Sequence, residues 1–379
     1  MHFALIPGDA VSNQMLEIQA RLRAWGYDSH IYAQILAPEM RERARPASEY
    51  LDLLQAPGDL LLYHYGLYHP NVRYYQAMQG RRVLIYHNIT PAHYYRGWDR
   101  SQELLCDLGR RVLPLLTRCD LALGDSDYNR RELVRAGCAE DRTGVLPIFL
   151  PQAHFDALPV ARDLRADLDA AGTINLLTVG RVAPNKAIED AIRIFAVYHR
   201  AINPRSRLYV VGSRYLPAYD AALDELVADL GLEDSVVFTG RVPDAELKTY
   251  FLGAHVYLAT SLHEGFCVPI VEAMHFGLPI LARRAAAMPE TLADAGVLFT
   301  RLGYEEVAEM VHLLVTDVSL RTRIIDRQRA RLQEYAPSRV EATLRTHLRN
   351  LDVPLPEGGT PPNPVGAGSP RPRPHLAEE

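Results

Sequence analysis

Lysine is nearly absent from this chain of 379 residues, since only Lys186 and Lys248 among its 41 basic side chains are lysine. Cysteine is also scarce. Its four positions, 106, 119, 138 and 267, follow no metal-ligand spacing, so we expect reduced structural thiols. The net charge of -5 disfavours general binding to nucleic acid, which requires a basic surface. These shortages argue against a zinc-finger protein and against a nucleic-acid-binding protein.

Long apolar runs are missing as well. No uninterrupted run approaches the length of a membrane span, and residues 1–6 lack the basic flank and cleavage pattern of a signal peptide. Residues 99–118 favour a helix with a broad apolar face and several arginines. This pattern suits an interfacial membrane helix, but a buried domain helix kinked at Pro114 is the more common case. We therefore expect a cytoplasmic protein with at most peripheral contact at the inner face of a membrane.

The order of apolar runs predicts two α/β domains, each large enough for its own core. In the first half, strand-like runs alternate with helical stretches, which favours a mostly parallel sheet covered on both faces; the runs are residues 3–6, 29–33, 60–65, 83–87 and 121–124. A new sheet begins at 174–179. We predict a Rossmann-like domain at 1–155, a linker at 156–172, a second such domain at 173–336, a helix at 337–351 that completes the first domain, and a disordered proline-rich tail at 354–379.

Residues 263–274, His-Glu-Gly-Phe-Cys-Val-Pro-Ile-Val-Glu-Ala-Met, carry the clearest chemical signal. Proline suits the first turn of a helix because its missing N–H would be unpaired there, so Pro269 predicts that a helix begins here. The N–H groups of Gly265, Phe266 and Cys267 then lack partners at the positive end of the helix dipole. Such a helix start favours an anionic or oxygen-rich ligand, and Gly265 lets it approach the backbone.

Two glutamates flank these N–H groups. Glu264 precedes the turn and Glu272 lies inside the predicted helix. Carboxylates accept hydrogen bonds from vicinal hydroxyls while the amides donate to oxygens, so the pair suits a nucleotide sugar. Taken alone, Glu264 is better explained as a solvated loop residue, and Glu272 as a residue that complements the helix dipole.

Two cations border another strand-to-helix turn in the second half. Arg181 follows the strand at 174–179, and Lys186 precedes a helix for which Asn185 is a candidate cap. Together they can neutralise a diphosphate and stabilise the charge that grows on its leaving oxygen. Each can instead be an ordinary surface charge.

In the first half, three strand ends carry polar residues, and ligands of open α/β sheets bind beyond strand C-termini. Gly8 follows the first strand, and His87 follows the strand at 83–87, where a histidine can meet a substrate hydroxyl. Residues 93–98, His-Tyr-Tyr-Arg-Gly-Trp, suit either an acceptor site or simple packing. Residues 125–127, Asp-Ser-Asp, have metal-binding chemistry, but a helix cap at Ser126 or Asp127 explains them better.

The spacing of Glu264 and Glu272, eight residues apart around Gly-Phe-x-x-Pro, resembles the signature of the retaining family 4 glycosyltransferases. The resemblance is strongest over residues 174–299. It implies the GT-B fold, in which two doubly wound Rossmann-like domains face a cleft. It also implies transfer of a hexosyl unit, with retention of configuration, from a nucleotide-diphosphate sugar to a glycan, lipid-linked or small-molecule hydroxyl.

The resemblance further implies roles for individual residues and the absence of metal and cofactor. Glu272 would bind the ribose, while Glu264 and the amides of Gly265, Phe266 and Cys267 would bind the sugar. The other expected contacts are Arg181 and Lys186 on the diphosphate, His87 on the sugar from the first domain, Val242 beside the base, and Gly8 facing the donor. Relatives have more glycine than this chain in the turn after the first strand.

Two rival functions share this layout: a sugar-nucleotide epimerase or phosphorylase, and a catalytically silent nucleotide-sugar-binding protein. The presence of Arg181, Lys186, Glu264 and Glu272 together disfavours the silent protein. The expected partners are a GDP- or UDP-linked sugar and a carbohydrate or lipid-linked acceptor.

Overall fold

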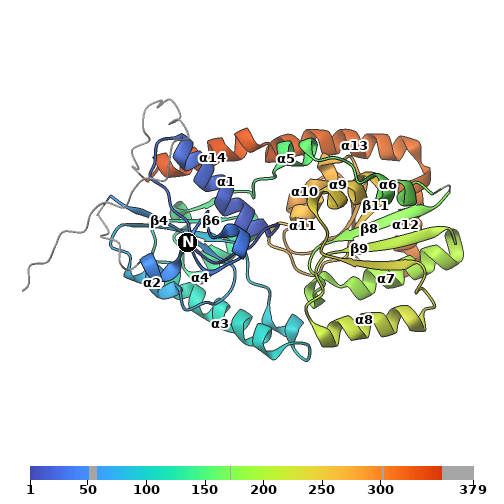
Figure 1. Cartoon of the computed structure of the whole chain (residues 1–379), viewed down its shortest axis with the longest axis horizontal. Helices are drawn as coiled ribbons and strands as arrows, with labels where there is room; N and C mark the ends of the chain where they lie inside the picture. Colours follow the sequence, from blue (N-terminus) through green and yellow to red (C-terminus); the bar gives the residue numbers. More distant parts are fainter. Residues whose placement is uncertain (51–57, 171, 301–302, 352–379) are drawn as a thin grey trace, which may run out of the picture.

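The computed structural model describes residues 1–50, 58–170, 172–300 and 303–351, so the tail predicted at 354–379 lies outside the described residues. The chain forms two α/β units that lie side by side along the long axis of the molecule (Figure 1). We call the part built on strands β1 to β7 the first unit and the part built on β8 to β13 the second unit.

The first unit contains two parallel sheets, of order β1-β2-β3 and β4-β5-β6-β7. Its strands are β1 (His2–Leu5), β2 (Tyr32–Leu36), β3 (Arg45–Pro46), β4 (Leu60–Tyr65), β5 (Arg81–Tyr86), β6 (Leu121–Gly124) and β7 (Thr143–Val145). The two sheets meet where the N-terminal ammonium of Met1 donates to the Leu62 carbonyl at 2.6 Å and the His64 N–H donates to the Met1 carbonyl at 2.9 Å. These bonds join the start of β1 to β4, so the two sheets are nearly continuous with each other.

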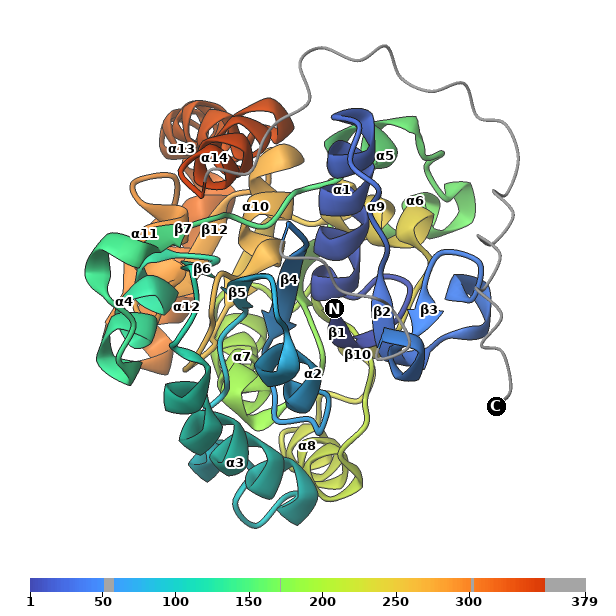
Figure 2. The ribbon, with the colours of Figure 1, turned by 90° about the vertical axis from the view of Figure 1, so that its left-hand side faces the viewer.

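Helices cover both faces of the first unit (Figure 2). They are α1 (Ala10–Ala24), α2 (Val72–Ala77), α3 (Arg100–Leu116) and α4 (Asp127–Ala136). Successive side chains of a strand point to opposite faces, and on β5 Val83 and Ile85 pack with α1 residues whereas Leu84 and Tyr86 belong to the cluster that includes residues of α2 and α3. A buried parallel sheet with apolar residues on both faces is therefore present, as predicted.

The second unit holds one six-stranded parallel sheet of order β10-β9-β8-β11-β12-β13. Its strands are β8 (Ile174–Val179), β9 (Ser206–Val211), β10 (Val236–Gly240), β11 (Val256–Ala259), β12 (Ile280–Arg283) and β13 (Val297–Phe299). Its helices are α7 (Ile188–Val197), α8 (Pro217–Asp229), α9 (Asp244–Gly253), α10 (Val268–His275), α11 (Met288–Leu292) and α12 (Tyr304–Thr316), and α5 (Gln152–Ala157) and α6 (Arg162–Leu168) precede it. The strand order reverses between β8 and β11, which is where ligands bind in doubly wound sheets.

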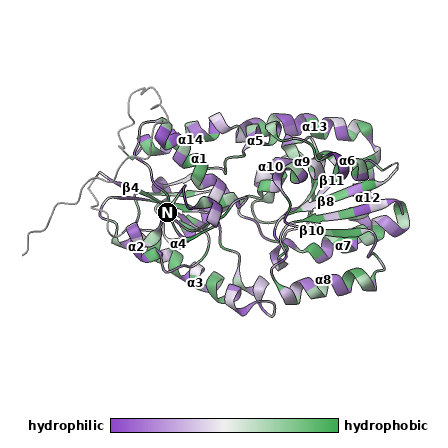
Figure 3. Cartoon of the chain, viewed as in Figure 1, coloured by the Kyte–Doolittle hydropathy of each residue, from purple (hydrophilic) through white to green (hydrophobic). Residues whose placement is uncertain are grey.

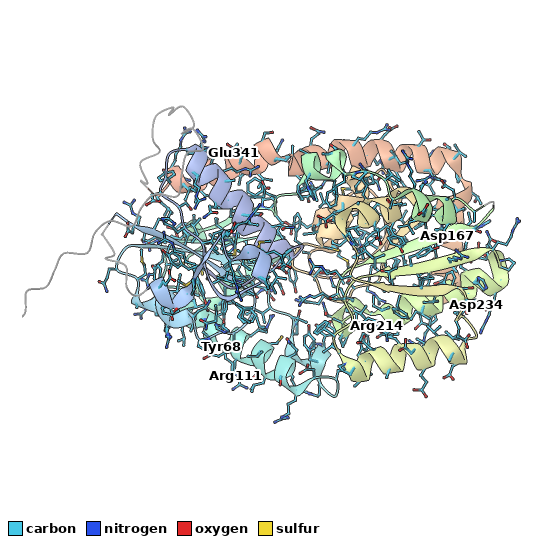
Figure 4. All side chains as sticks on the ribbon, viewed as in Figure 1. Tyr68, Arg111, Asp167, Arg214, Asp234 and Glu341 are labelled. Atoms are coloured by element: carbon cyan, nitrogen blue, oxygen red, sulfur yellow. The ribbon has the colours of Figure 1, made fainter. Side chains whose placement is uncertain are left out.

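The chain returns to the first unit at its end. Helix α13 (Val318–Leu332) leads to α14 (Pro337–Arg349), and both run along one side of the molecule (Figure 1). Three apolar residues of α14, Val340, Leu344 and Leu348, pack with Ile18 and Trp25 in one cluster. Glu341 of α14, labelled in Figure 4, accepts a hydrogen bond from the Trp25 ring at 3.2 Å. Polar residues alternate with apolar ones along these helices (Figure 3), as expected for helices half covered by a core.

The sequence predicted most elements correctly, with two local errors. The strand predicted at 29–33 is β2 (Tyr32–Leu36), displaced toward the C-terminus. Asn185 does not cap α7, because Ala187 holds the cap position at φ 48° and the Asn185 amide donates to the His263 carbonyl at 3.0 Å. The domain boundaries at 155 and 173 stay a prediction.

Candidate active site

The start of α10 has the geometry expected from the sequence. The helix begins at Val268 with Pro269 in its first turn, and Cys267 before it adopts φ 70° and provides no side-chain cap. Within the described residues, no acceptor contacts the N–H groups of Gly265, Phe266 or Cys267. These donors, together with the positive end of the α10 dipole, suit an oxygen-rich ligand.

Lys186 and Glu264 form an ion pair beside this turn. The Lys186 ammonium lies 2.5 Å from Glu264 Oε1, which also accepts from the Ser261 hydroxyl at 2.7 Å. The turn that carries Lys186 is held by Thr260, the residue that follows β11. The Thr260 hydroxyl contacts the Lys186 and Ala187 carbonyls at 3.1 and 2.9 Å. The sequence assigned Lys186 and Glu264 to different parts of a ligand, and the structure joins them directly.

A small cavity lies at the C-terminal ends of β8 and β11, where the strand order reverses. Its lining includes Gly180, Arg181, Lys186, Thr260 and Ser261. Arg181 is exposed, and its guanidinium lies 5.9 Å from the centre of the Tyr215 ring. Two cations, one paired and one exposed, therefore border the same cavity and can meet an anionic group there.

Glu272 is buried on α10 without a cation beside it among the described residues. Burial, with a smaller contribution from the Asp244 carboxylate at the start of α9, raises the pKa of Glu272 to about 8. Burial, with contributions from the charges of Glu264 and Glu272, raises the pKa of the Cys267 thiol well above its usual value. Glu272 is thus a buried carboxyl group on α10 for which no hydrogen-bond partner is found among the described residues.

The loops of Gly8 and Val242 face each other across the two units. Arg241 donates to the Pro7 carbonyl. Gly8 has φ +68°, a backbone conformation that favours glycine, and the flexible end of the Arg241 side chain lies beside it. Val242, next to Arg241, is partly buried against the core of the second unit. The Arg241 side chain thus links the loops that carry Gly8 and Val242, and the contact of these two residues with a donor stays a prediction.

His87 lies in a buried chain of hydrogen bonds. Its Nδ1 lies 2.9 Å from Asp125 Oδ2 and its Nε2 lies 2.8 Å from His64 Nδ1, and its side chain is only 3% exposed. Because a carboxylate only accepts, His87 donates from Nδ1 to Asp125, and its Nε2 shares a second hydrogen bond with His64 Nδ1. Burial raises the pKa of Asp125 and lowers that of His64 well below its usual value. Both ring nitrogens of His87 are occupied, so the predicted direct contact with a sugar lacks a free nitrogen and stays a prediction.

The residue after His87 links the two units. Asn88 has φ 70°, and its Oδ1 lies 2.6 Å from His263 Nε2. A Cβ on Gly265 would lie 2.6 Å from the Asn88 Cβ and 3.0 Å from the His87 carbonyl. The expectation that Gly265 leaves room for a ligand needs correction, because the space at its Cα is filled by the first unit. Its N–H is still available.

The remaining candidates serve packing or capping. Ser126 caps α4 by accepting from the Asn129 N–H at 3.2 Å, as predicted for 125–127. In the loop 93–98, the Tyr95 hydroxyl lies 3.4 Å from that of Tyr215, and Trp98 contacts Tyr219 edge to face at 5.2 Å. These contacts favour packing between the units over an acceptor site.

The side chain of Phe266 also belongs to the core. It is buried and packs edge to face on Tyr335. Only its backbone N–H is available to a ligand.

Four further residues contact the predicted site or hold its loops together: Ser261, His263, Ser126 and Glu290. The sequence indicated Ser126 only as a helix cap and His263 only as the start of the 263–274 stretch, and it assigned none of the four to the site. Across the described ranges, no group of three or more His, Cys, Asp and Glu side chains is arranged to hold a metal, and no helix is both long and apolar enough to cross a membrane. The predictions on metal, cofactor and location stay predictions.

Residues 162–331 match the family described as Glycosyl transferases group 1. The match covers slightly less than half of the chain. It is 25% identical over 242 residues to O-antigen chain mannosyltransferase B of Escherichia coli, covering 61% of this chain and 60% of the relative. It is 31% identical over 219 residues to D-inositol 3-phosphate glycosyltransferase of Thermobifida fusca, covering 55% and 50%. The chain thus spans less than two thirds of the length of each of these two relatives.

Solved structures agree over a longer stretch. Anabaena HepE in complex with UDP and glucose matches with a TM-score of 0.73 at 18% identity, covering 92% of this chain and 99% of HepE. Sucrose-phosphate synthase from Thermosynechococcus elongatus matches with a TM-score of 0.71 at 17% identity, covering 93% and 98%. The GT-B fold predicted from the sequence is confirmed.

Proposed function

We propose that this group 1 protein is a retaining, metal-independent glycosyltransferase that moves a hexosyl unit from a UDP- or GDP-linked sugar to a hydroxyl group. The observation that carries the proposal is the Lys186–Glu264 pair, with 2.5 Å between Nζ and Oε1, at the cavity where the sheet order reverses. Beside it lie three backbone N–H donors and an exposed arginine, Arg181. Such a set suits a ligand that combines a diphosphate with hydroxyl groups.

Each group has a chemical task in this proposal. Arg181 and the ammonium of Lys186 stabilise the negative charge that develops on the diphosphate as the bond to the sugar breaks. Glu264 fixes that ammonium and accepts from a sugar hydroxyl with its second oxygen, and Glu272 accepts from the ribose hydroxyls in its ionised form. The acceptor hydroxyl forms the new bond and passes its proton to a leaving phosphate oxygen. Glu264 is held by Lys186 and Ser261, which favours this direct route over a covalent glutamate intermediate.

The names of relatives support the substrate classes. One relative is named an O-antigen chain mannosyltransferase and another a D-inositol 3-phosphate glycosyltransferase. HepE is described in complex with UDP and glucose. We infer a hexosyl donor, and an acceptor that is a glycan, a lipid-linked sugar or a small polyol.

A thermal-stability screen tests the proposal. UDP-glucose, UDP-N-acetylglucosamine, GDP-mannose and ADP-glucose are added separately to the wild-type protein and to Glu272→Gln. A donor present at 100 times its Kd should stabilise the wild type by about 2.7 kcal/mol, and the variant by less. Product analysis then separates transfer from epimerisation. If all four donors leave the melting temperature unchanged, the proposed function is wrong.

A further inference from the structure

Helix α4 of the first unit is capped by a carboxylate of the second unit. The N–H groups of Asp127 and Tyr128 donate to the two oxygens of Glu290, at 2.5 Å to Oε1 and 2.9 Å to Oε2. Ser126 satisfies the next donor, the N–H of Asn129. The first turn of α4 is therefore capped jointly by its own serine and by a residue more than 160 positions away.

The charges around this contact favour it. The N-terminus of the ten-residue α4 carries the positive end of a helix dipole, which attracts a carboxylate. The carboxylate of Asp127 is near the same end but is compensated by Arg130 at 2.6 Å and Arg131 at 3.3 Å. Glu290 consequently meets the N–H groups without an uncompensated negative neighbour on α4.

Helix α11, which carries Glu290, is held in place by hydrogen bonds from α13. Arg331 of α13 donates to the carbonyls of Glu290 and Thr291 at 2.6 and 3.2 Å. The Thr291 hydroxyl in turn donates to the Phe266 carbonyl at 2.6 Å. Glu290 is therefore linked, through its neighbour Thr291, to the loop that precedes α10.

The same turn of α4 also binds that loop directly. The Ser126 hydroxyl donates to the Gly265 carbonyl at 2.7 Å, and Gly265 fits against Asn88 only because it lacks a side chain. Glu290 and Gly265 thus dock side by side on one helix end. Because both residues contact the first turn of α4, the contact of either one with α4 holds the other near its own partner.

We propose that Glu290 is a positioning residue. By capping α4 from the second unit, it holds the loop 264–267 against the first unit and fixes the separation of the two halves of the site. Its effect on catalysis rests on the proposed function, but its effect on the arrangement of the two units does not.

The test compares Glu290→Gln and Glu290→Ala with Asp294→Asn. Asp294 is a matched control because its carboxylate is 73% exposed and pairs only loosely, at 3.7 Å, with Arg327 of the same unit. Spin labels on Leu104→Cys in α3 and Ala221→Cys in α8 report the separation of the units, since both positions are exposed and these helices lie on different units. The four native cysteines are buried, and unsubstituted protein treated with the label gives the background.

We expect both Glu290 variants to shift the distance distribution to longer and broader separations, with Glu290→Ala showing the larger change and Asp294→Asn none. With UDP-glucose or GDP-mannose as donor, we expect kcat to fall about tenfold or more in Glu290→Gln, as for loss of a charge-assisted hydrogen bond, while the melting temperature changes little. An unchanged distance distribution in both Glu290 variants overturns the proposal. If the wild type uses neither donor, the proposed function is in doubt, yet the distance measurement still decides the role of Glu290.

Discussion

Lys186 Nζ lies 2.5 Å from Glu264 Oε1, although 78 residues separate the two in the chain. The pair forms where the turn after β8 meets the loop after β11, at the reversal of strand order. Its side chains are mostly buried, at 20% and 11% exposure, so the ammonium is held in place and does not need to reorganise when charge develops nearby.

For Lys186→Ala we expect turnover to fall by the equivalent of about 2 to 4 kcal/mol in barrier stabilisation, comparable with removal of one preorganised oxyanion donor. Lys186→Arg should recover only part of the rate, because a planar guanidinium does not reproduce a point charge. Steady-state kinetics with the donor found in the screen measures both. Lys248→Ala is the matched control, since the Lys248 ammonium binds carbonyls at 155 and 158. A rise in KM with unchanged kcat would contradict a role in the transition state.

Glu272 should make both stability and donor binding depend on pH. Its pKa is raised to about 8 in the folded protein, so the folded state holds the proton more tightly than the unfolded state. Stability should therefore fall as the pH rises from about 5 to about 8, and Glu272→Gln should gain stability relative to the wild type over that range. Thermal melts of the two proteins measure the difference. Equal pH profiles would show that Glu272 is not buried as described.

Donor affinity should change with pH in the opposite direction to stability. Ribose hydroxyls donate to the ionised carboxylate, so donor affinity should rise as the pH increases toward about 8, with proton release on binding. Glu272→Gln should weaken binding by about 1 to 3 kcal/mol and abolish this pH dependence. Calorimetric titrations in buffers of different ionisation enthalpy measure both effects. Unaltered affinity in the folded variant would return Glu272 to a structural role.

Gly265→Ala tests the close contact of the donor loop with the first unit. An added methyl group would meet Asn88 Cβ at 2.6 Å and the His87 carbonyl at 3.0 Å. We expect a loss of about 1 to 3 kcal/mol in unfolding free energy, the usual cost of overpacking, and lower turnover. Gly58→Ala is the control, because no atom of the described residues lies within 4 Å of its Cβ position. Equal denaturation curves for the two variants would show that the loop has room to move.

Leu344→Ala tests the return of α14 to the first unit. Leu344 is fully buried, so its truncation should cost about 2 to 5 kcal/mol of unfolding free energy. Leu313→Ala, on α12 and 50% exposed, should cost far less. Chemical denaturation measures both. Similar small losses would mean that α14 contributes little to the first unit.

The sequence predicted the parts of this fold that depend on local pattern. The apolar runs at Ile174–Val179 and Leu60–Tyr65 match strands β8 and β4, and Pro269 located the start of α10. The strand near residue 30 was misplaced, because apolar and polar residues there do not define a register until β1 pairs with it. The α7 cap was wrong because Asn185 lies in a separate 3-10 turn, Pro184–Lys186, and Ala187 holds the cap position.

The candidate site divides in the same way, into residues that a local motif predicts and residues that depend on long-range contacts. Local motifs identified Glu264, Glu272, Arg181 and Lys186; the structure places Arg181 and Lys186 at one cavity, pairs Lys186 with Glu264, and places Glu272 on α10. The contacts across the two units, such as Glu290 on α4, were not predictable, because a carboxylate that caps a distant helix carries no sequence signal. The occupation of both His87 nitrogens likewise depends on Asp125 and His64, which are distant in sequence.

The central claim is that the protein transfers a hexosyl unit with retention of configuration and that Lys186 assists this transfer. The anomeric configuration of the sugar first released from a donor tests this claim most directly. Proton NMR follows the anomer that appears when the wild type hydrolyses an α-linked donor, UDP-glucose or GDP-mannose, before mutarotation, with Lys186→Ala run in parallel. We predict that the α anomer appears first and that Lys186→Ala releases it about 30-fold more slowly or worse, as expected for the loss of a preorganised cation. Initial release of the β anomer, or equal rates in the two proteins, would contradict the account.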